Sequence, residues 1–207
     1  VFAHADIAEL AAYSSVPIIN GLSDLYHPCQ ALADYLTIWD RFGALKGIRL
    51  AYIGDGNNVA HSLLLGGAQL GVHVAVATPS GYEPNPEVVG AARAAAGQTG
   101  ASISLHHDPA EAARGADALY TDVWTSMGQE AETKERLARF AGYQIDADLL
   151  AQAAPRAIVL HCLPAHRGEE IAADVIDGRQ SAVFDQAENR MHAQKAVLAS
   201  LLRSPDA

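Results

Sequence analysis

The chain has 207 residues, of which 50% are hydrophobic and 18% are charged. That composition excludes a disordered chain. The length suffices for one large domain or two small ones. Acidic residues outnumber basic ones by 24 to 14, giving a formal net charge of −10. This charge argues against binding to nucleic acid or to anionic membranes, because both need a basic face. No apolar run reaches the roughly 18 residues of a membrane span. Two cysteines are too few for a disulfide framework, so we expect a cytoplasmic protein.

Short β-rich runs alternate with helical patterns along the chain. After an extended piece at 16–19, strands are predicted at 48–54, 72–78, 103–107, 118–123 and 157–163. Helices are predicted at 29–42, 57–70, 86–96, 109–114, 132–140, 146–153 and 188–202. Because several strands are almost entirely apolar, the pattern predicts an α/β fold: a doubly wound, Rossmann-like parallel sheet with helices on both faces. Ligands of such sheets bind beyond the carboxyl ends of the strands.

The first predicted helix shows apolar residues at helical spacing, namely Leu32, Tyr35, Leu36 and Trp39. Pro28 suits its first position, which places His27 at the positive end of the helix. That position disfavours a protonated imidazole, so His27 would be neutral and could donate a hydrogen bond to a developing oxyanion. The alternative is a histidine that only caps the helix.

The turn Gly54-Asp55-Gly56 follows the first strand of the sheet and opens a helix. A dinucleotide fingerprint would need a third glycine, where Val59 stands, and an acidic residue after the next strand. The glycines therefore predict a tight strand-to-helix turn. Asn57 and Asn58 follow it, and since one amide suffices for the cap, the other is available to a carboxylate or an ammonium group.

Polar residues also follow the strand at 118–123. Asp122 could be a helix cap, but Ser126 follows within a few residues. A carboxylate accepts hydrogen bonds from an ammonium group, and a hydroxyl can share that task. The group is typical of a clamp for an amino acid.

Cys162, near the end of the last strand, has three interpretations. It could be a small buried apolar residue, a zinc ligand together with His161 and His166, or a thiol or thiolate at the mouth of a site. Neighbouring residues on a strand point to opposite faces, which makes the zinc site geometrically poor. We expect no metal and favour the third interpretation.

Arg190 lies in the first turn of the predicted last helix, which is an unfavourable place for a cation. It therefore needs an anionic partner. That partner could be Asp185 or Glu188 in the same segment, or a phosphate or carbonyl group of a ligand.

Six segments together resemble the ornithine carbamoyltransferases, within the aspartate/ornithine transcarbamoylase family. They are LYHPCQALADYLT at 25–37, GDGNNVAHS at 54–62, ATPSGYEPN at 77–85, TDVWTSMGQE at 121–130, HCLPAHRGEEI at 161–171 and AENRMHAQKAVLASLL at 187–202. Six segments in the right order make a chance match implausible. The SMG and HCLP sequences indicate ornithine, not aspartate, as the acceptor.

The resemblance implies carbamoyl transfer from carbamoyl phosphate to the δ-amine of ornithine, giving citrulline and phosphate as in arginine biosynthesis, without a cofactor. Matched by motif, the ornithine clamp comprises Asn58, Asp122, Ser126 and the backbone of Met127. The carbamoyl-phosphate contacts comprise His27, Gln30, Cys162, the Leu163 carbonyl and Arg190. Among these, the resemblance gives His27, Cys162 and Arg190 catalytic roles, with Cys162 as a proton acceptor.

One departure from the family is large. Its members hold the phosphate with a Ser-Thr-Arg-Thr turn in an amino-terminal domain, and this sequence contains no such turn and begins with Val1. We therefore expect a fragment, inactive alone, of a homotrimeric enzyme. Residues 1–28 would end the carbamoyl-phosphate domain, 29–186 would form the ornithine domain with a crossover helix, and 187–207 would be a terminal helix that packs on the missing domain.

Two alternatives stay open. A related transcarbamoylase could act on another amine or amino acid, a choice that the loop from Asp122 to Met127 would set. A non-catalytic α/β module could instead bind a nucleotide, although the incomplete glycine fingerprint speaks against it.

Overall fold

The structure, a computed structural model, describes residues 2–125 and 130–202. Its core is one five-stranded parallel sheet in the order β3-β2-β1-β4-β5. The strands are β1 (Arg49–Ile53), β2 (His73–Ala77), β3 (Ile103–His106), β4 (Ala118–Thr121) and β5 (Ile158–His161). The predicted doubly wound parallel sheet is confirmed.

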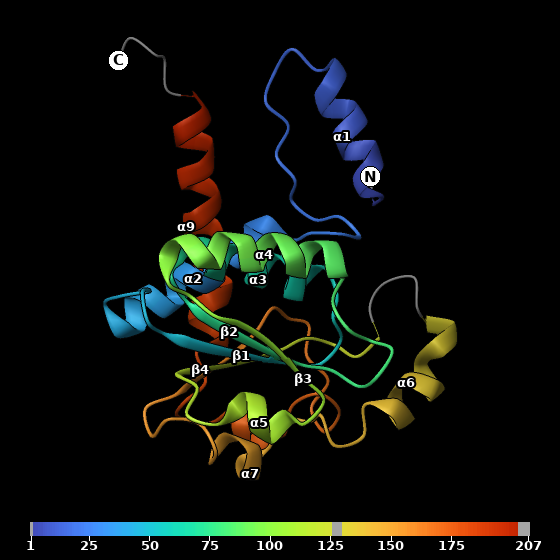
Figure 1. The fold of residues 1–207 in the computed structure, drawn as a ribbon, viewed down its shortest axis with the longest axis vertical. Coiled ribbons are helices and arrows are strands. Elements are labelled where there is room, and N and C mark those ends of the chain that lie inside the picture. The colour runs from blue at the N-terminus through green and yellow to red at the C-terminus, as the bar shows by residue number, and fades with distance from the viewer. Residues whose placement is uncertain (1, 126–129, 203–207) are drawn as a thin grey trace.

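The helices are α1 (His4–Tyr13), α2 (Pro28–Phe42), α3 (Asn58–Leu70), α4 (Pro86–Thr99), α5 (Pro109–Ala113), η1 (Glu130–Glu132), α6 (Thr133–Arg139), α7 (Ala147–Leu150), α8 (Ala173–Ile176) and α9 (Val183–Leu202). Helices α2, α3 and α4 pack on one face of the sheet, and α5, α7 and α8 pack on the other (Figure 1). None of the described helices combines the length and apolar character of a membrane span.

Local sequence explains where the main helices begin and end. The Asn57 side chain accepts hydrogen bonds from the backbone N–H groups of Val59 and Ala60, which caps α3. Gly43 and Gly71 end α2 and α3 in the left-handed conformation, which glycine adopts without steric cost.

Three features differ from the sequence prediction. Helix α9 begins at Val183, five residues earlier than expected, so Arg190 lies two turns inside the helix and not in its first turn. Helices α1 and α8 were not predicted, and α1 contains no buried residue. The extended piece at 16–19 joins no sheet.

The strand order brings three chain segments together. Strand β4 lies between β1 and β5 and runs parallel to both, so the segments that follow Ile53, Thr121 and His161 leave the sheet at one edge. Helix α9 then packs against α2 and β5, which adds Arg190 and Gln30 to that side of the molecule.

Candidate functional site

Asp122 is the centre of the polar residues at the carboxyl edge of the sheet. It follows β4 directly and is 7% exposed. Its Oδ2 accepts a hydrogen bond from Asn57 Nδ2 at 2.8 Å, and its Oδ1 accepts from Cys162 Sγ at 2.9 Å and from the Val123 N–H at 2.8 Å. Segments that follow β1, β4 and β5 thus meet at one carboxylate, as the sequence predicts for parallel strands.

Cys162 is a neutral thiol that donates its hydrogen bond to Asp122. Burial, followed by the charge of Asp122, raises the pKa of the Cys162 thiol well above its usual range. A thiolate would face the carboxylate across 2.9 Å. Of the two protonation states that the sequence left open, the structure therefore favours the thiol.

The zinc interpretation of this segment fails on geometry. His161 Nε2 lies 3.1 Å from Glu170 Oε1, and His161 Nδ1 accepts the Leu163 N–H at 2.9 Å, so both ring nitrogens have partners. His166 turns to Glu170 instead of Cys162. One ligand atom each of Asp122, His161 and Cys162 lies within 4.8 Å of the others, but the zinc set proposed from the sequence does not converge.

The two adjacent asparagines, Asn57 and Asn58, make contacts that differ from those predicted from the sequence. Asn57 both caps α3 with its oxygen and donates to Asp122 with its nitrogen. Asn58, the predicted ornithine ligand, donates instead to the Ser23 carbonyl at 2.6 Å. Its role toward a ligand stays a prediction, and Asn57 is the asparagine that reaches the carboxylate.

His27 occupies the N-cap position of α2, but its side chain makes no capping hydrogen bond. The interpretation as a simple cap is therefore wrong. The ring is 8% exposed and its Nδ1 has no hydrogen-bond partner in the structure. Burial, and next the Arg190 charge, lower the pKa of His27 to about 4. The imidazole is neutral at physiological pH, as the sequence predicts.

We expect the His27 ring signals to titrate with a midpoint near pH 4 in an NMR pH series. In the unfolded chain the imidazole has its ordinary pKa of 6.5, so between pH 6.5 and 4 the unfolded state binds more protons. The free energy of unfolding should then fall as the pH is lowered through that window.

His27→Gln should remove this contribution. Burial raises the pKa of Asp34 to about 7, which acts with the opposite sign, because the folded state then binds the extra proton. Asp34 is present in both proteins, so the difference in unfolding free energy between them isolates His27. A difference that does not change between pH 6.5 and 4 would contradict the assignment.

Arg190 contacts Gln30, with Nη1 donating to Gln30 Oε1 at 2.6 Å. Neither acidic neighbour serves as its partner: Asp185 pairs with Arg41, and Glu188 lies 3.6 Å from His192. The local pairing left open by the sequence is thus wrong. A cavity of about 580 Å³ opens beside Arg190, and His27 and Cys29 line it as well.

A second cavity, of about 640 Å³, lies beside the turn that follows β1. At its wall Arg136, 6% exposed, donates to Asp55 Oδ2 at 2.7 Å, to the Trp124 carbonyl at 3.0 Å and to Glu132 Oε2 at 3.0 Å. No sequence motif marks Arg136, so its role could not be predicted from the sequence. Arg136 joins α6 to the segments that follow β1 and β4.

Two of the predicted clamp residues, Ser126 and Met127, lie outside the described residues. Leu163, whose carbonyl was predicted to meet the ligand, has a left-handed backbone with φ of 59°.

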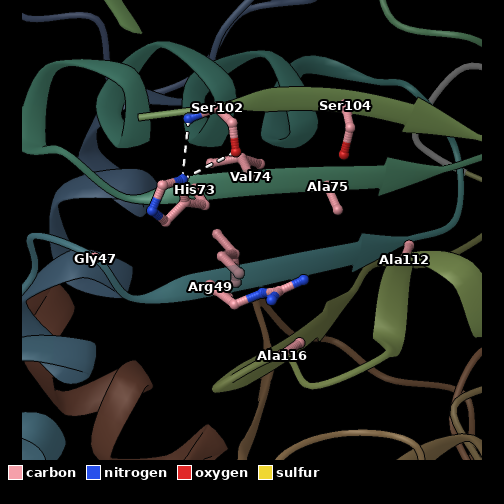
Figure 2. Close-up of a pocket in the computed structure, with 10 residues that line it drawn as sticks. Gly47, Arg49, His73, Val74, Ala75, Ser102, Ser104, Ala112 and Ala116 are labelled. Carbon is pink, nitrogen blue, oxygen red and sulfur yellow. Dashed lines mark hydrogen bonds between the residues drawn. The ribbon is translucent and has the colours of Figure 1, made fainter. Parts of the chain in front are cut away.

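A further hollow of about 340 Å³ lies at the other end of the strands, between Arg49, His73 and Ser102 (Figure 2). None of the predicted site residues lines it.

Two family models match the chain. The family model described as aspartate/ornithine carbamoyltransferase, Asp/Orn binding domain, matches residues 46–201. The model described as the carbamoyl-P binding domain of the same family matches residues 1–40, which include most of α2.

Proteins with similar sequences are named ornithine carbamoyltransferase. Ornithine carbamoyltransferase of Acidothermus cellulolyticus is 63% identical over 201 residues, which are 97% of this chain and 64% of that protein. The anabolic enzyme of Pyrococcus furiosus is 56% identical and is covered to 64%. The solved structure of the P. furiosus enzyme matches with a TM-score of 0.93 at 57% identity, over 96% of this chain and 63% of that chain. The solved structure of the Gloeobacter violaceus enzyme matches with a TM-score of 0.92 at 56% identity, over 98% of this chain and 68% of that chain. The chain spans about 64% of the curated relatives' length, and it belongs to the aspartate/ornithine carbamoyltransferase family.

Proposed function

We propose that this chain supplies the ornithine half of an ornithine carbamoyltransferase, which carbamoylates the δ-amine of L-ornithine and yields L-citrulline and phosphate. The observation that carries the proposal is the buried Asp122 carboxylate, whose partners are an amide, a thiol and a backbone N–H. A carboxylate held by neutral donors can still accept a hydrogen bond from an amine or ammonium group. Relatives 56–63% identical that carry this enzyme's name support the assignment.

The proposed reaction forms a C–N bond to the carbamoyl carbon and breaks the bond from that carbon to the phosphate oxygen. The amine loses a proton as it attacks, and an oxygen of the departing phosphate accepts that proton. Because the Cys162–Asp122 pair holds its proton on sulfur, Cys162 cannot accept another proton, whereas the Asp122 carboxylate keeps lone pairs for a hydrogen bond from the amine. We therefore assign Asp122 to orient the amine, with Cys162 as its neutral partner at the reacting centre, in place of the proton acceptor that the family resemblance implies.

Charge develops on the carbamoyl oxygen and on the departing phosphate. The neutral imidazole of His27 can donate a hydrogen bond to that oxygen, and the Arg190 guanidinium can contact the phosphate or the carbonyl group. Gln30 adds an amide beside Arg190. Phosphate is a good leaving group, so alignment and charge stabilisation account for most of the proposed catalysis.

The remaining assignments belong to the same proposal. Residues 1–28 close the carbamoyl-phosphate domain, 29–186 form the ornithine domain with its crossover helix, and α9 from residue 187 onward packs on the rest of the enzyme. Asn58, Ser126 and Met127 complete the ornithine clamp, and the Leu163 carbonyl faces the carbamoyl group. The complete protein is proposed to be a cytoplasmic homotrimer; both cysteines are free thiols, in keeping with a reducing compartment.

The test uses what we call the completed enzyme, in which this chain follows the amino-terminal carbamoyl-phosphate-binding segment of the Acidothermus cellulolyticus relative. The completed enzyme should form citrulline from ornithine and carbamoyl phosphate, and the chain alone should form little. Putrescine, which is ornithine without its α-carboxylate, should be a poor acceptor. Preference for another amine would instead indicate a related transcarbamoylase, and turnover of the chain alone at the rate of the completed enzyme would contradict the division of labour.

A further inference from the structure

Asp34 is a fully buried carboxyl group on the second turn of α2. Its side chain is 0% exposed. Oδ1 accepts hydrogen bonds from Gln30 Nε2 at 2.8 Å and from Gln186 Nε2 at 2.7 Å. Gln30 lies one turn earlier on α2, whereas Gln186 comes from α9. One oxygen atom therefore joins two helices through two side-chain amides.

Each of these amides has its other end fixed toward the site. Gln30 Oε1 accepts from Arg190 Nη1 at 2.6 Å, and Gln186 Oε1 accepts from the His161 N–H at 2.9 Å. A side-chain amide has one donor end and one acceptor end. Once Asp34 binds both nitrogens, both oxygens must face the opposite way, toward Arg190 and toward the residue before Cys162.

We propose that Asp34 is a positioning residue that orients the amides of Gln30 and Gln186, and through them sets Arg190 relative to the strand end that carries Cys162. The proposal rests on the proposed function, which places the carbamoyl group between these two residues. Asp34 itself is buried beneath them and touches no reacting atom.

The physical cost of this carboxyl group argues that it does more than hold two helices together. Asp34 Oδ2 is buried and has no hydrogen-bond partner in the structure, and burial raises the pKa of Asp34 to about 7. A well-packed apolar residue would join α2 and α9 without that desolvation cost. One turn further along, Asn189 and Thr37 tie the same helices with a hydrogen bond of 2.9 Å and no buried charge.

Three variants separate positioning from packing. Asp34→Leu keeps the number and branching of the side-chain heavy atoms and removes the acceptor, and Asp34→Asn keeps an acceptor oxygen. Thr37→Val is the matched control, because Thr37 is also buried on α2 and also contacts α9, but its bond leads neither to Arg190 nor to β5.

Hydrogen exchange in this chain alone tests the orientation without any activity. Exchange of the His161 backbone N–H and of the Gln30 and Gln186 side-chain amides, followed by NMR, should be at least about tenfold faster in Asp34→Leu, because a hydrogen bond lost at 1.4 kcal/mol is a factor of ten. Asp34→Asn and Thr37→Val should leave these rates close to those of the unsubstituted chain. Unchanged exchange in Asp34→Leu would overturn the proposal.

Kinetics of the completed enzyme test the consequence. Asp34→Leu should lower kcat by about 100-fold, the loss expected for a misplacement near 1 Å, and Asp34→Asn should restore most of it. Thr37→Val should lower only thermal stability. Equal losses of kcat in Thr37→Val and Asp34→Leu would indicate a packing role and overturn the proposal.

If Asp34→Leu does not fold, Gln186→Met tests the connection from Asp34 through Gln186 to His161. The expected results are faster exchange of the His161 N–H and a lower kcat. Failure of the unsubstituted completed enzyme to form citrulline would contradict the proposed function only, since the exchange measurement judges Asp34 independently.

Discussion

Asp122→Asn should lower kcat/KM for ornithine in the completed enzyme by about 100-fold or more. The substitution places an amide nitrogen against at least one of the donors Asn57 Nδ2 and Cys162 Sγ. It also leaves the proposed amine without its charged acceptor. Breaking a buried ion pair by removing one partner costs about 3–5 kcal/mol, and each 1.4 kcal/mol corresponds to a factor of ten.

Steady-state kinetics with ornithine as the varied substrate measures this loss. Cys162→Ala is the comparison, since it removes the thiol and keeps the carboxylate; its turnover should fall by a smaller factor of about ten, the worth of one charge-assisted hydrogen bond. Thermal unfolding should show that Cys162→Ala disturbs the fold less than it disturbs turnover. Asp122→Asn with unchanged kinetics would remove Asp122 from the proposed clamp, and Cys162→Ala with full turnover would remove Cys162 from the mechanism.

Gly56→Ala should destabilise the chain by about 3 kcal/mol, at the upper end of the cost of overpacking. A Cβ at this position would lie 2.6 Å from the Tyr82 carbonyl oxygen and 2.5 Å from the Glu83 carbonyl carbon. Both contacts are with backbone, which cannot turn aside as a long side chain can. The Gly56 N–H also donates to the Tyr82 carbonyl at 2.9 Å, so the loop cannot move without losing that bond.

Gly90→Ala is the matched control. Gly90 lies on the exposed side of α4, and a Cβ there would meet no atom within 4 Å. The same substitution should therefore stabilise the chain, by about 1 kcal/mol, because alanine favours a helix over glycine by that amount. Urea unfolding of the two variants should give opposite signs. A Gly56→Ala variant as stable as the parent would show that the 82–84 loop can shift freely.

The sheet and its functional edge could be predicted from the sequence because both depend on local patterns. Apolar strands indicate a buried parallel sheet, and the carboxyl ends of its strands were the predicted place of the site; the structure adds that Asp122 and Cys162 are in contact there. The capping of α3 by an asparagine and the neutral state of His27 also followed from helix geometry.

The parts that were missed depend on contacts between segments distant in the chain. On α2, Leu32 and Trp39 have helical apolar spacing but are 47% and 52% exposed, whereas Asp34 is fully buried. Asp34 is buried because α9 packs against α2 and Gln186 binds its carboxylate, and the predicted start of α9 at 188 leaves Gln186 out of the helix. Arg136 likewise gains its role from Asp55, which is 81 residues away.

The tie between α2 and α9 also constrains the order in which the molecule can be built. The hydrogen bond from Gln186 to Asp34 spans 152 residues, and the one from Arg190 to Gln30 spans 160. During synthesis, α2 leaves the ribosome long before its partner helix exists, so Asp34 stays hydrated until the residues of α9 have been made. Contacts of such long sequence separation form slowly because the loop between them must close first. The sheet can therefore form before the site does, and the region around Arg190 is among the last parts of the molecule to acquire its native contacts.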